Sequence, residues 1–325
     1  MATIADNFMR GQLVERRNRL QLAVGESDNA SRYARLLAEV DAALARIEDG
    51  SYGICESCHE SIEYDRLIAD PLVRLCLDHL TAREKEALEQ DLQLAAQVQR
   101  GLLPNPDFAR DGWRISYHYE PAGLVSGDYC DVVDGGESGL FFVLGDVSGK
   151  GVAASMLMAH LHAMFRSLIS VGLSLKCILE HASRIFSQST LPTQYATLVC
   201  GRAYPNGRVE LCNAGHVRPL VASGRRVAQL EASNLPVGIF SDEEFSVDEL
   251  QLASGDCVVL YSDGISEATD ASGAEYGSDR LVRLVGNQAE HSPAALVAAC
   301  RADWTGFLGG ARKTDDATML VLSRA

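Results

Sequence analysis

The spacing of apolar residues changes once along this chain of 325 residues, near Pro104. Before that point, apolar side chains such as Leu36, Val40 and Leu44 recur every three or four residues, which is typical of amphipathic helices. After Trp113, short apolar runs alternate with a few helical stretches. Strands are expected at 115–119, 140–144, 196–201, 209–213, 258–261 and 319–322, and helices at 152–170, 175–188, 279–285 and 293–307. The sequence therefore predicts a helical N-terminal part followed by an α+β part.

The helical part is expected to begin with an antiparallel hairpin. Its first arm starts near Thr3, its second runs over 31–47, and turn-forming residues occupy 25–29 between them. A further helix at about 81–103 stops at Pro104, whose ring cannot continue a helix. The expected domains are a hairpin with a cysteine-containing segment over 1–80, a linker helix over 81–104 and an α+β domain over 105–325.

The linker helix carries a short coiled-coil seam. Steps of four and three residues alternate along Leu88, Leu92, Ala95, Gln99 and Leu102. Such a seam is covered either by the chain's own domain or by a second copy, and fewer than three heptads do not decide between them. A homodimer through the linker helix is therefore one of two open interpretations.

The charge and the cysteines limit the partner and location classes. The formal net charge of −15 argues against direct binding to nucleic acid or to an anionic membrane. The most apolar run, 139–145, is far shorter than the roughly 20 residues of a membrane helix. The N-terminus lacks the basic and apolar stretches of a secretory signal, and nine cysteines in that context indicate reduced thiols. The expected location is the cytoplasm.

Two short knuckles carry ligand-type side chains. Cys55 and Cys58 form the first, and Cys76 and His79 form the second, with seventeen residues between the two knuckles. A two-residue spacer lets both side chains of a knuckle bind one ion, and thiolates with an imidazole favour zinc over magnesium or calcium. The alternative is a redox Cys-x-x-Cys with an unrelated cysteine and histidine. The pattern predicts one structural zinc ion on these four residues, with His59 outside the set.

The residues around the first knuckle, Arg-Ile-Glu-Asp-Gly-Ser-Tyr-Gly-Ile-Cys-Glu-Ser-Cys over 46–58 and Ile-Glu-Tyr-Asp-Arg-Leu over 62–67, resemble the DksA/TraR-type zinc fingers. His79 stands where many members have a fourth cysteine. The resemblance covers the first eighty residues or so and implies RNA polymerase binding through acidic residues at the hairpin tip, here Glu26 and Asp28. Arms of about 20 residues reach only roughly 30 Å. A structural, sensory or dimerising role is preferred, with RNA polymerase contact as the alternative.

Four aspartates in the C-terminal part stand in distinctive settings. Asp128 lies in Ser-Gly-Asp-Tyr, Asp146 and Asp263 each follow an apolar strand, and Asp315 precedes the last one. A carboxylate at the end of a buried strand is costly unless a cation or hydrogen bonds compensate it. A single Asp-Gly is more often a β-turn. Four such sites, if they converge, predict a two-metal centre acting on a phosphoryl group.

Six motifs resemble, in their order, those of PPM-type phosphatases of the SpoIIE/RsbU branch: Ser-Gly-Asp-Tyr from 126, Gly-Asp-Val-Ser-Gly-Lys-Gly-Val-Ala-Ala from 145, Asn-Ala-Gly-His-Val-Arg-Pro-Leu from 213, Leu-Pro-Val-Gly from 235, Tyr-Ser-Asp-Gly-Ile-Ser-Glu-Ala from 261 and Asp-Asp-Ala-Thr from 315. The preceding Gln-Val-Gln-Arg-Gly-Leu-Leu-Pro from 97 is similar to the linker that introduces these domains. The resemblance spans about 92–325 and implies a four-layer αββα sandwich.

The resemblance also implies a site for two Mn²⁺ or Mg²⁺ ions. Asp146 would bridge both ions, Asp263 and Asp315 would complete one site, and Asp128 with the backbone carbonyl of Val147 would serve the other, some through water. A water activated by the two metals would attack the phosphoester in line. No covalent phosphoenzyme is needed, so none of the nine cysteines has to be a nucleophile.

One departure from the family concerns substrate grip. Eukaryotic relatives carry a phosphate-gripping arginine shortly before the first aspartate, and 121–126 contains none. The grip is expected from the metals or from another residue. His216 is expected to shape a turn rather than to act as a general acid. Asp316 and Glu267 are expected beside the ligands rather than among them.

These observations predict a metal-dependent phosphoserine/phosphothreonine protein phosphatase. By resemblance, its substrate is an anti-sigma-factor antagonist in a partner-switching pathway. The alternative is an RNA-polymerase-binding transcription regulator that uses the N-terminal module. A catalytically silent scaffold ranks last, because all four aspartates are present.

Overall fold

The structure is a computed structural model. It describes residues 4–24, 30–63, 66–67, 70–80, 82–231, 234–288 and 292–325. Glu26 and Asp28, the expected tip residues, lie outside the described residues. The chain divides into two compact units, Met1–Gln90 and Asp91–Ala325. The division falls inside helix α4 (Ala82–Leu102), within the segment expected as a linker.

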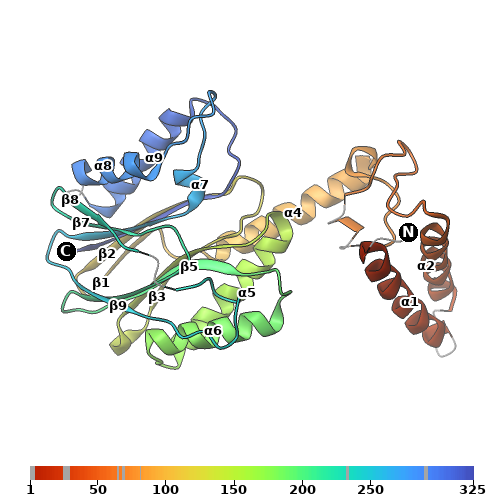
Figure 1. The fold of residues 1–325 in the computed structure, drawn as a ribbon, viewed down its shortest axis with the longest axis horizontal. Coiled ribbons are helices and arrows are strands. Elements are labelled where there is room, and N and C mark those ends of the chain that lie inside the picture. Colours follow the sequence, from red (N-terminus) through yellow and green to blue (C-terminus); the bar gives the residue numbers. More distant parts are fainter. Residues whose placement is uncertain are drawn as a thin grey trace. The chain divides into compact units, whose positions relative to one another are not determined.

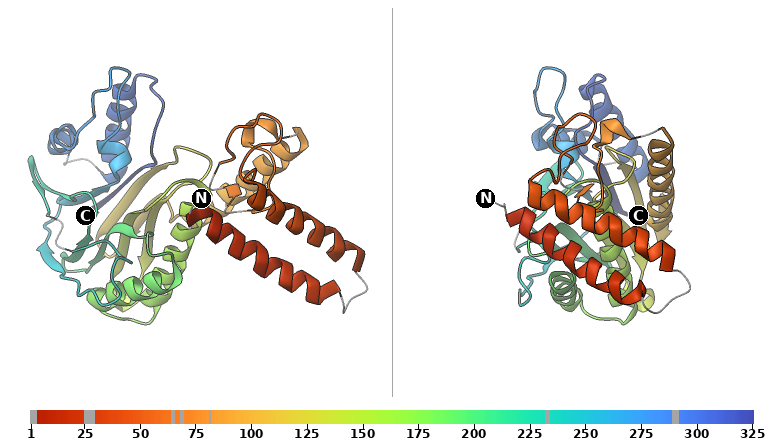
Figure 2. Two further views of the ribbon diagram at one scale, coloured as in Figure 1. Left: turned by 45° about the vertical axis from the view of Figure 1, so that its right-hand side comes forward. Right: turned by 90° about the vertical axis from the view of Figure 1, so that its right-hand side faces the viewer.

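The N-terminal unit begins with the expected hairpin. Helices α1 (Ile4–Val24) and α2 (Ala30–Asp49) lie side by side, as Figure 2 shows. Leu13 of α1 and Val40 and Leu44 of α2 are buried together. The three- and four-residue spacing of the apolar side chains therefore predicted the face that packs.

In the described part of the segment after α2, residues 66–67 are helical and Leu77–His79 form the short 3₁₀ helix η1. The buried side chains of this segment are Cys55, Ile62, Leu67 and Cys76, joined by Met9 of α1. A core of so few side chains is small for a folded segment, and such segments usually need a disulfide or a metal.

The second unit contains two sheets in the described part of the chain. One has the strand order β1-β2-β11-β10-β7-β8 and the other β3-β4-β5-β6-β9. The strands are β1 (Asp107–Arg110), β2 (Trp113–Glu120), β3 (Asp128–Asp134), β4 (Leu140–Val147), β5 (Ala196–Ala203), β6 (Arg208–Ala214), β7 (Leu220–Ser223), β8 (Arg226–Gln229), β9 (Asp248–Gln251), β10 (Cys257–Tyr261) and β11 (Ala317–Arg324). All neighbouring strands in both sheets are antiparallel.

The two sheets stack between two helical layers, as Figure 1 shows. Helices α5 (Gly151–Ser170) and α6 (Leu175–Ser189) cover the β3–β9 sheet, and α8 (Ser278–Gln288) and α9 (Pro293–Leu308) cover the other. Three apolar clusters fill the spaces between successive layers. The expected four-layer αββα sandwich is confirmed.

Strand β3 was not expected from the sequence, although it carries Asp128. Its first five residues are all buried, so it shows no alternation of polar and apolar positions, and three of its seven residues are aspartates, which are depleted in strands. Asp131 is fully buried. The Asp131 carboxylate is compensated by Arg166 of α5, whose Nε and Nη2 donate to its two oxygens at 2.9 and 2.8 Å. A bidentate ion pair of this kind offsets the cost of burying the charge.

Helix α5 is long and apolar enough to cross a membrane by length and composition alone, and 44% of its apolar window is buried inside the unit. Its buried side chains include Met158, Leu161 and Phe165, which belong to the cluster between the helices and the β3–β9 sheet. The apolar composition of α5 is therefore explained by its place as a core helix.

Candidate metal centres

The four aspartates meet at one edge of the sandwich. Asp128 opens β3 and pairs with Asp146 near the end of the antiparallel neighbour β4. In the other sheet, Asp263 follows β10 and Asp315 precedes β11, and these two strands are also antiparallel neighbours. The end of one strand and the start of its antiparallel partner lie at the same edge. The sequence placed Asp146, Asp263 and Asp315 beside expected strands, whereas the strand that opens on Asp128 was not expected; the topology brings all four together.

Burial and neighbouring carboxylates raise the pKa of three of these carboxyl groups. Burial, followed by the charges of Asp263 and Asp315, raises the pKa of Asp146 to about 7. Burial and the charge of Asp315 raise the pKa of Asp263, and burial and the charge of Asp146 raise that of Asp128 well above its ordinary value. A set of oxygen ligands with this mutual repulsion fits a hard divalent cation, which would relieve it.

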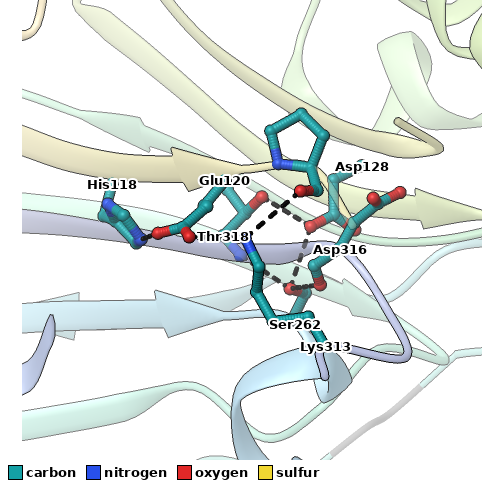
Figure 3. Close-up of polar contacts among 8 residues, drawn as sticks. His118, Glu120, Asp128, Ser262, Lys313, Asp316 and Thr318 are labelled. Carbon is teal, nitrogen blue, oxygen red and sulfur yellow. Dashed lines mark hydrogen bonds and ion pairs between the residues drawn. The ribbon is translucent and has the colours of Figure 1, made fainter. Parts of the chain in front are cut away.

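Asp128 differs from the other three because its side chain is almost completely buried. Its Oδ2 accepts a hydrogen bond from Ser262 Oγ at 2.9 Å and another from Thr318 Oγ1 (Figure 3). Thr318 lies in β11 of the opposite sheet and Ser262 directly follows β10 of that sheet, so this carboxylate joins the two sheets. Both hydroxyl residues lie inside motifs noted in the sequence, but their spacing gave no sign of this role.

Two glycines keep the loops of the centre close together. A Cβ on Gly264, next to Asp263, would lie 2.0 Å from the carbonyl oxygen of Asp316. A Cβ on Gly127 would lie 3.2 Å from Asp146 Oδ1 and 3.3 Å from the Val147 carbonyl oxygen. Any side chain at Gly264 would therefore push the Asp263 loop away from the Asp315 loop.

Asp316 and Gln99 support the loop that leads into Asp128. Asp316 Oδ1 and Oδ2 accept from the backbone N–H groups of Ala122 and Gly127 at 2.7 and 2.8 Å. Gln99 of α4 is buried, donates to the Ser126 carbonyl oxygen at 2.7 Å and accepts from the Ser126 N–H at 2.9 Å. This part of the linker seam is therefore covered by the chain's own domain.

Two other side chains border the carboxylates. Lys150 Nζ donates to Asp315 Oδ2 at 2.7 Å and to the Thr314 carbonyl oxygen at 3.0 Å, a contact that sequence reasoning missed. Partial desolvation, followed by the nearby charge of Asp263, raises the pKa of the Glu267 carboxyl, although the residue as a whole is exposed. Its backbone N–H bonds to the Asp263 carbonyl oxygen at 2.7 Å.

His216 shapes a buried turn. Its N–H donates to Asn213 Oδ1 at 2.8 Å, the Asn213 amide donates back to its carbonyl at 3.1 Å, and its Nδ1 lies 2.9 Å from Thr197 Oγ1. Burial lowers the pKa of His216 to about 4. A neutral buried imidazole of this kind is poorly suited to protonate a leaving group at neutral pH.

The four knuckle residues of the N-terminal unit converge. The ligand atoms of Cys55, Cys58, Cys76 and His79 all lie within 4.8 Å of one another. Cys58 and Cys76 have their sulfurs 3.7 Å apart, close to the edge of about 3.8 Å expected for tetrahedral zinc–sulfur bonds of about 2.3 Å. Burial opposes ionisation of Cys55, but backbone N–H donors outweigh it and lower the pKa to about 6. The set fits a zinc ion. His59 lies outside it.

Comparison with known proteins matches one family to each part of the chain. Residues 136–325 match the family model described as stage II sporulation protein E (SpoIIE). The chain belongs to the SpoIIE family. The matched residues of this family include Asp146, Asp263 and Asp315, whereas Asp128 lies before them. Residues 50–78 match the prokaryotic dksA/traR C4-type zinc finger, which includes the three cysteines and stops before His79.

Individual relatives cover different parts of the chain. Phosphoserine phosphatase RsbU of Bacillus subtilis is 28% identical over 204 residues, 60% of this chain and 59% of RsbU. The structure of the SiaA-PP2C domain of Pseudomonas aeruginosa aligns with a TM-score of 0.65 at 19% identity, covering 75% of this chain and 99% of that domain. The RNA polymerase-binding transcription factor DksA of Salmonella typhimurium is 37% identical over 59 residues, 18% of this chain and 39% of DksA. The chain spans about half the length of the curated SpoIIE-type relatives it matches.

Proposed function

We propose that this protein is a divalent-metal-dependent phosphatase of phosphoserine and phosphothreonine proteins. The observation that carries the proposal is the convergence of Asp146, Asp263 and Asp315 at one edge of the sandwich, where burial and their mutual repulsion raise the pKa of Asp146 to about 7. Membership of the SpoIIE family and the similarity to a phosphoserine phosphatase support it.

The proposed ligands are Asp146 for both ions, Asp263 and Asp315 for one, and the Val147 carbonyl with Asp128 for the other. When bound, two Mn²⁺ or Mg²⁺ ions supply charge neutralisation at the phosphoryl group and an activated water. The chain's own part is to hold these oxygens in place. Because Ser262 and Thr318 occupy Oδ2 of Asp128, only its Oδ1 is left for a ligand or a water.

The five buried cysteines of the second unit are unsuited to act as nucleophiles. Burial raises the pKa of Cys212 and Cys300 to about 12 and of Cys257 to about 11, and it raises those of Cys130 and Cys200 well above the ordinary value. Since the thiolate is the reactive form, these side chains stay inert at neutral pH. None of these five cysteines is therefore part of the proposed reaction, in which water attacks the phosphoester.

The proposed substrate is an anti-sigma-factor antagonist in a partner-switching pathway, in the cytoplasm. This finer assignment rests on the similarity to the SpoIIE/RsbU branch. A homodimer through α4 is a further part of the proposal, because Leu94 and Val98 expose 61% and 60% of their surface. Changing both to aspartate would then lower the molecular mass measured by light scattering.

Hydrolysis of p-nitrophenyl phosphate tests the activity. The full chain is assayed with and without Mn²⁺, beside Asp146→Asn. We expect turnover that requires Mn²⁺ and falls at least about 100-fold in the variant. Turnover that persists unchanged in Asp146→Asn would contradict the proposed centre.

RNA polymerase binding by the N-terminal unit is the second candidate. It is favoured by the match of residues 50–78 to the dksA/traR finger and by the similarity to DksA. We propose one structural zinc on Cys55, Cys58, Cys76 and His79 in either case. Pull-down of purified RNA polymerase by the full chain, lost when Glu26 and Asp28 are changed to alanine, would support this candidate. No retention by the parent chain would count against it.

A further inference from the structure

The loop before Asp128 brings no cation to the centre, but other segments of the adjoining groove do. A cavity of about 650 Å³ beside Asp315 is lined by the loop 122–125, by Lys150 and Val152, and by the segment 312–316. The residue that offsets the charge of a bound phosphoryl group should therefore be sought among the lining residues outside the loop.

The three cations of this groove differ in their partners. Lys313 is bound to Glu120 and to the Pro121 carbonyl oxygen, and Lys150 is bound to Asp315, as described above (Figure 3 for Lys313). Arg312 is exposed and makes no hydrogen bond or ion pair with any residue in the described part of the chain. Arg312 is thus the cation of the groove that is free to bind an anion.

The rest of the groove is apolar and open. Leu124 and Val152 face it with 47% and 46% of their surface exposed, and Leu92 of α4 adds to the lining. Helix α5 begins at Gly151 in the same lining, and the N-terminus of a helix carries a partial positive charge. Charge and apolar surface together match a phosphorylated side chain next to an apolar residue.

We propose that this groove binds the phosphorylated segment of the protein substrate. Arg312 binds the phosphoryl oxygens, in place of the arginine that is missing before Asp128. Leu124 and Val152 pack against the residue beside the phosphorylated one. Arginine is suited to this task because its planar guanidinium donates two parallel hydrogen bonds to a phosphate, whereas lysine acts as a point charge. This inference rests on the proposed phosphatase function.

The experiment compares two substrates on the full chain with Mn²⁺: p-nitrophenyl phosphate and a phosphoserine peptide with leucine beside the phosphoserine. Arg312→Ala is expected to raise KM about 10-fold for both substrates, because the variant loses a hydrogen bond to a charged group. Its kcat should be nearly unchanged. Arg312→Lys is expected to recover part of that loss. Arg283→Ala, an exposed arginine on α8, is the matched control and should leave KM unchanged.

The apolar wall is tested with Leu124→Asp. Its KM should rise at least about 5-fold more for the peptide than for p-nitrophenyl phosphate, and exchange of the peptide leucine for glycine should remove that difference. KM values within twofold of the parent in Arg312→Ala, or a loss confined to kcat, would overturn the assignment of Arg312 while leaving the phosphatase proposal intact.

A parent chain without turnover would count against the proposed function and still leave the groove open to test. Binding of the fluorescent phosphoserine peptide is then measured by anisotropy without added Mn²⁺. At least fivefold weaker binding by Arg312→Ala than by Arg283→Ala supports the groove. Equal binding by the two variants overturns it.

Discussion

The two candidate metal centres of this chain are built in opposite ways. The Cys/His centre takes all four ligands from one short segment, Cys55 to His79, and its sulfur and nitrogen atoms already lie within 4.8 Å of one another. The carboxylate centre takes its residues from four strand ends of two sheets, Asp128 to Asp315. The first centre lies in a segment with a small core, whereas the second lies on a sandwich with large apolar clusters.

This difference decides where the stability of each centre comes from. The segment around the Cys/His centre has only a few buried side chains, so a bound ion would supply most of its folding free energy. The carboxylates sit on a sandwich with three large apolar clusters. The raised pKa of Asp146 means that the folded protein loses some stability when this carboxyl group ionises. The rest of the fold offsets this loss.

The largest expected effect is therefore on the Cys/His centre. Cys76→Ser should remove the hydrogen-exchange protection of residues 51–80, because zinc binding contributes about 10 kcal/mol or more in small fingers. Protection in residues 113–325 should be unchanged. Hydrogen-exchange mass spectrometry of the full chain measures both regions in one experiment.

The matched control is Cys177→Ser, a half-exposed cysteine of α6 outside the ligand set. It should leave both regions protected. If Cys76→Ser kept the protection of 51–80, the segment would not depend on a metal, and the redox interpretation of the knuckle would return.

Gly264 tests how closely the second centre is assembled. The Cβ of Gly264→Ala would lie 2.0 Å from the Asp316 carbonyl oxygen, so the Asp263 and Asp315 loops must separate. We expect a loss of about 3 kcal/mol in unfolding free energy and at least about 10-fold weaker Mn²⁺ binding. Urea unfolding and isothermal titration calorimetry measure the two effects.

Gly306→Ala in α9 is the control, because a Cβ there meets nothing within 4 Å. It should raise the unfolding free energy by about 0.5–1 kcal/mol, since alanine loses less backbone freedom in a helix. Mn²⁺ affinity equal to the parent in Gly264→Ala would show that the two loops are not held together by this contact.

The sequence predicted the local centre more completely than the assembled one. The knuckle spacing alone identified Cys55, Cys58, Cys76 and His79. The aspartates were found as separate strand-end residues, and only the ordered motifs linked them, because convergence depends on the order of strands in two sheets. Hydroxyl and amide partners such as Thr318 and Gln99 could not be assigned, since no spacing rule connects them to Asp128. Strand β3 was missed because three of its seven residues are aspartates and its buried run shows no alternation.

Asp146 tests the stability cost of the carboxylate centre. Its pKa is raised from 3.8 to about 7, so between these pH values the folded state binds more protons than the unfolded state. The unfolding free energy therefore decreases as pH rises through this window. An asparagine side chain cannot ionise, so Asp146→Asn should be more stable than the parent by about 1–3 kcal/mol at pH 8 without added Mn²⁺.

The gain of Asp146→Asn should shrink as the pH falls and disappear near pH 4. Urea unfolding of parent and variant between pH 4 and 8 measures it. An equal difference at every pH would mean that the substitution acts through packing rather than through the repulsion that distinguishes this centre from the Cys/His centre.

The smallest effect is expected at Gln99. Its substitution tests whether the carboxylate centre depends on residues outside the sandwich. Gln99 of α4 makes two hydrogen bonds to the backbone of Ser126, whose Oγ in turn accepts from the Asp128 N–H at 3.1 Å. Gln99→Ala should cost about 1–2 kcal/mol in unfolding free energy. We expect Mn²⁺ affinity to fall a few-fold, measured by calorimetry, because the loop before Asp128 loses its support.

Gln97→Ala, an exposed position on the same helix, controls for helix propensity and should leave Mn²⁺ affinity unchanged. A loss of affinity specific to Gln99→Ala would extend the second centre to a helix outside both sheets, so that a change in α4 could alter the metal site. Unchanged affinity with reduced stability would confine Gln99 to structural support. The two centres would then differ in where their ligands come from in the chain, one segment or four strand ends. Metal binding at the carboxylate centre would not depend on α4.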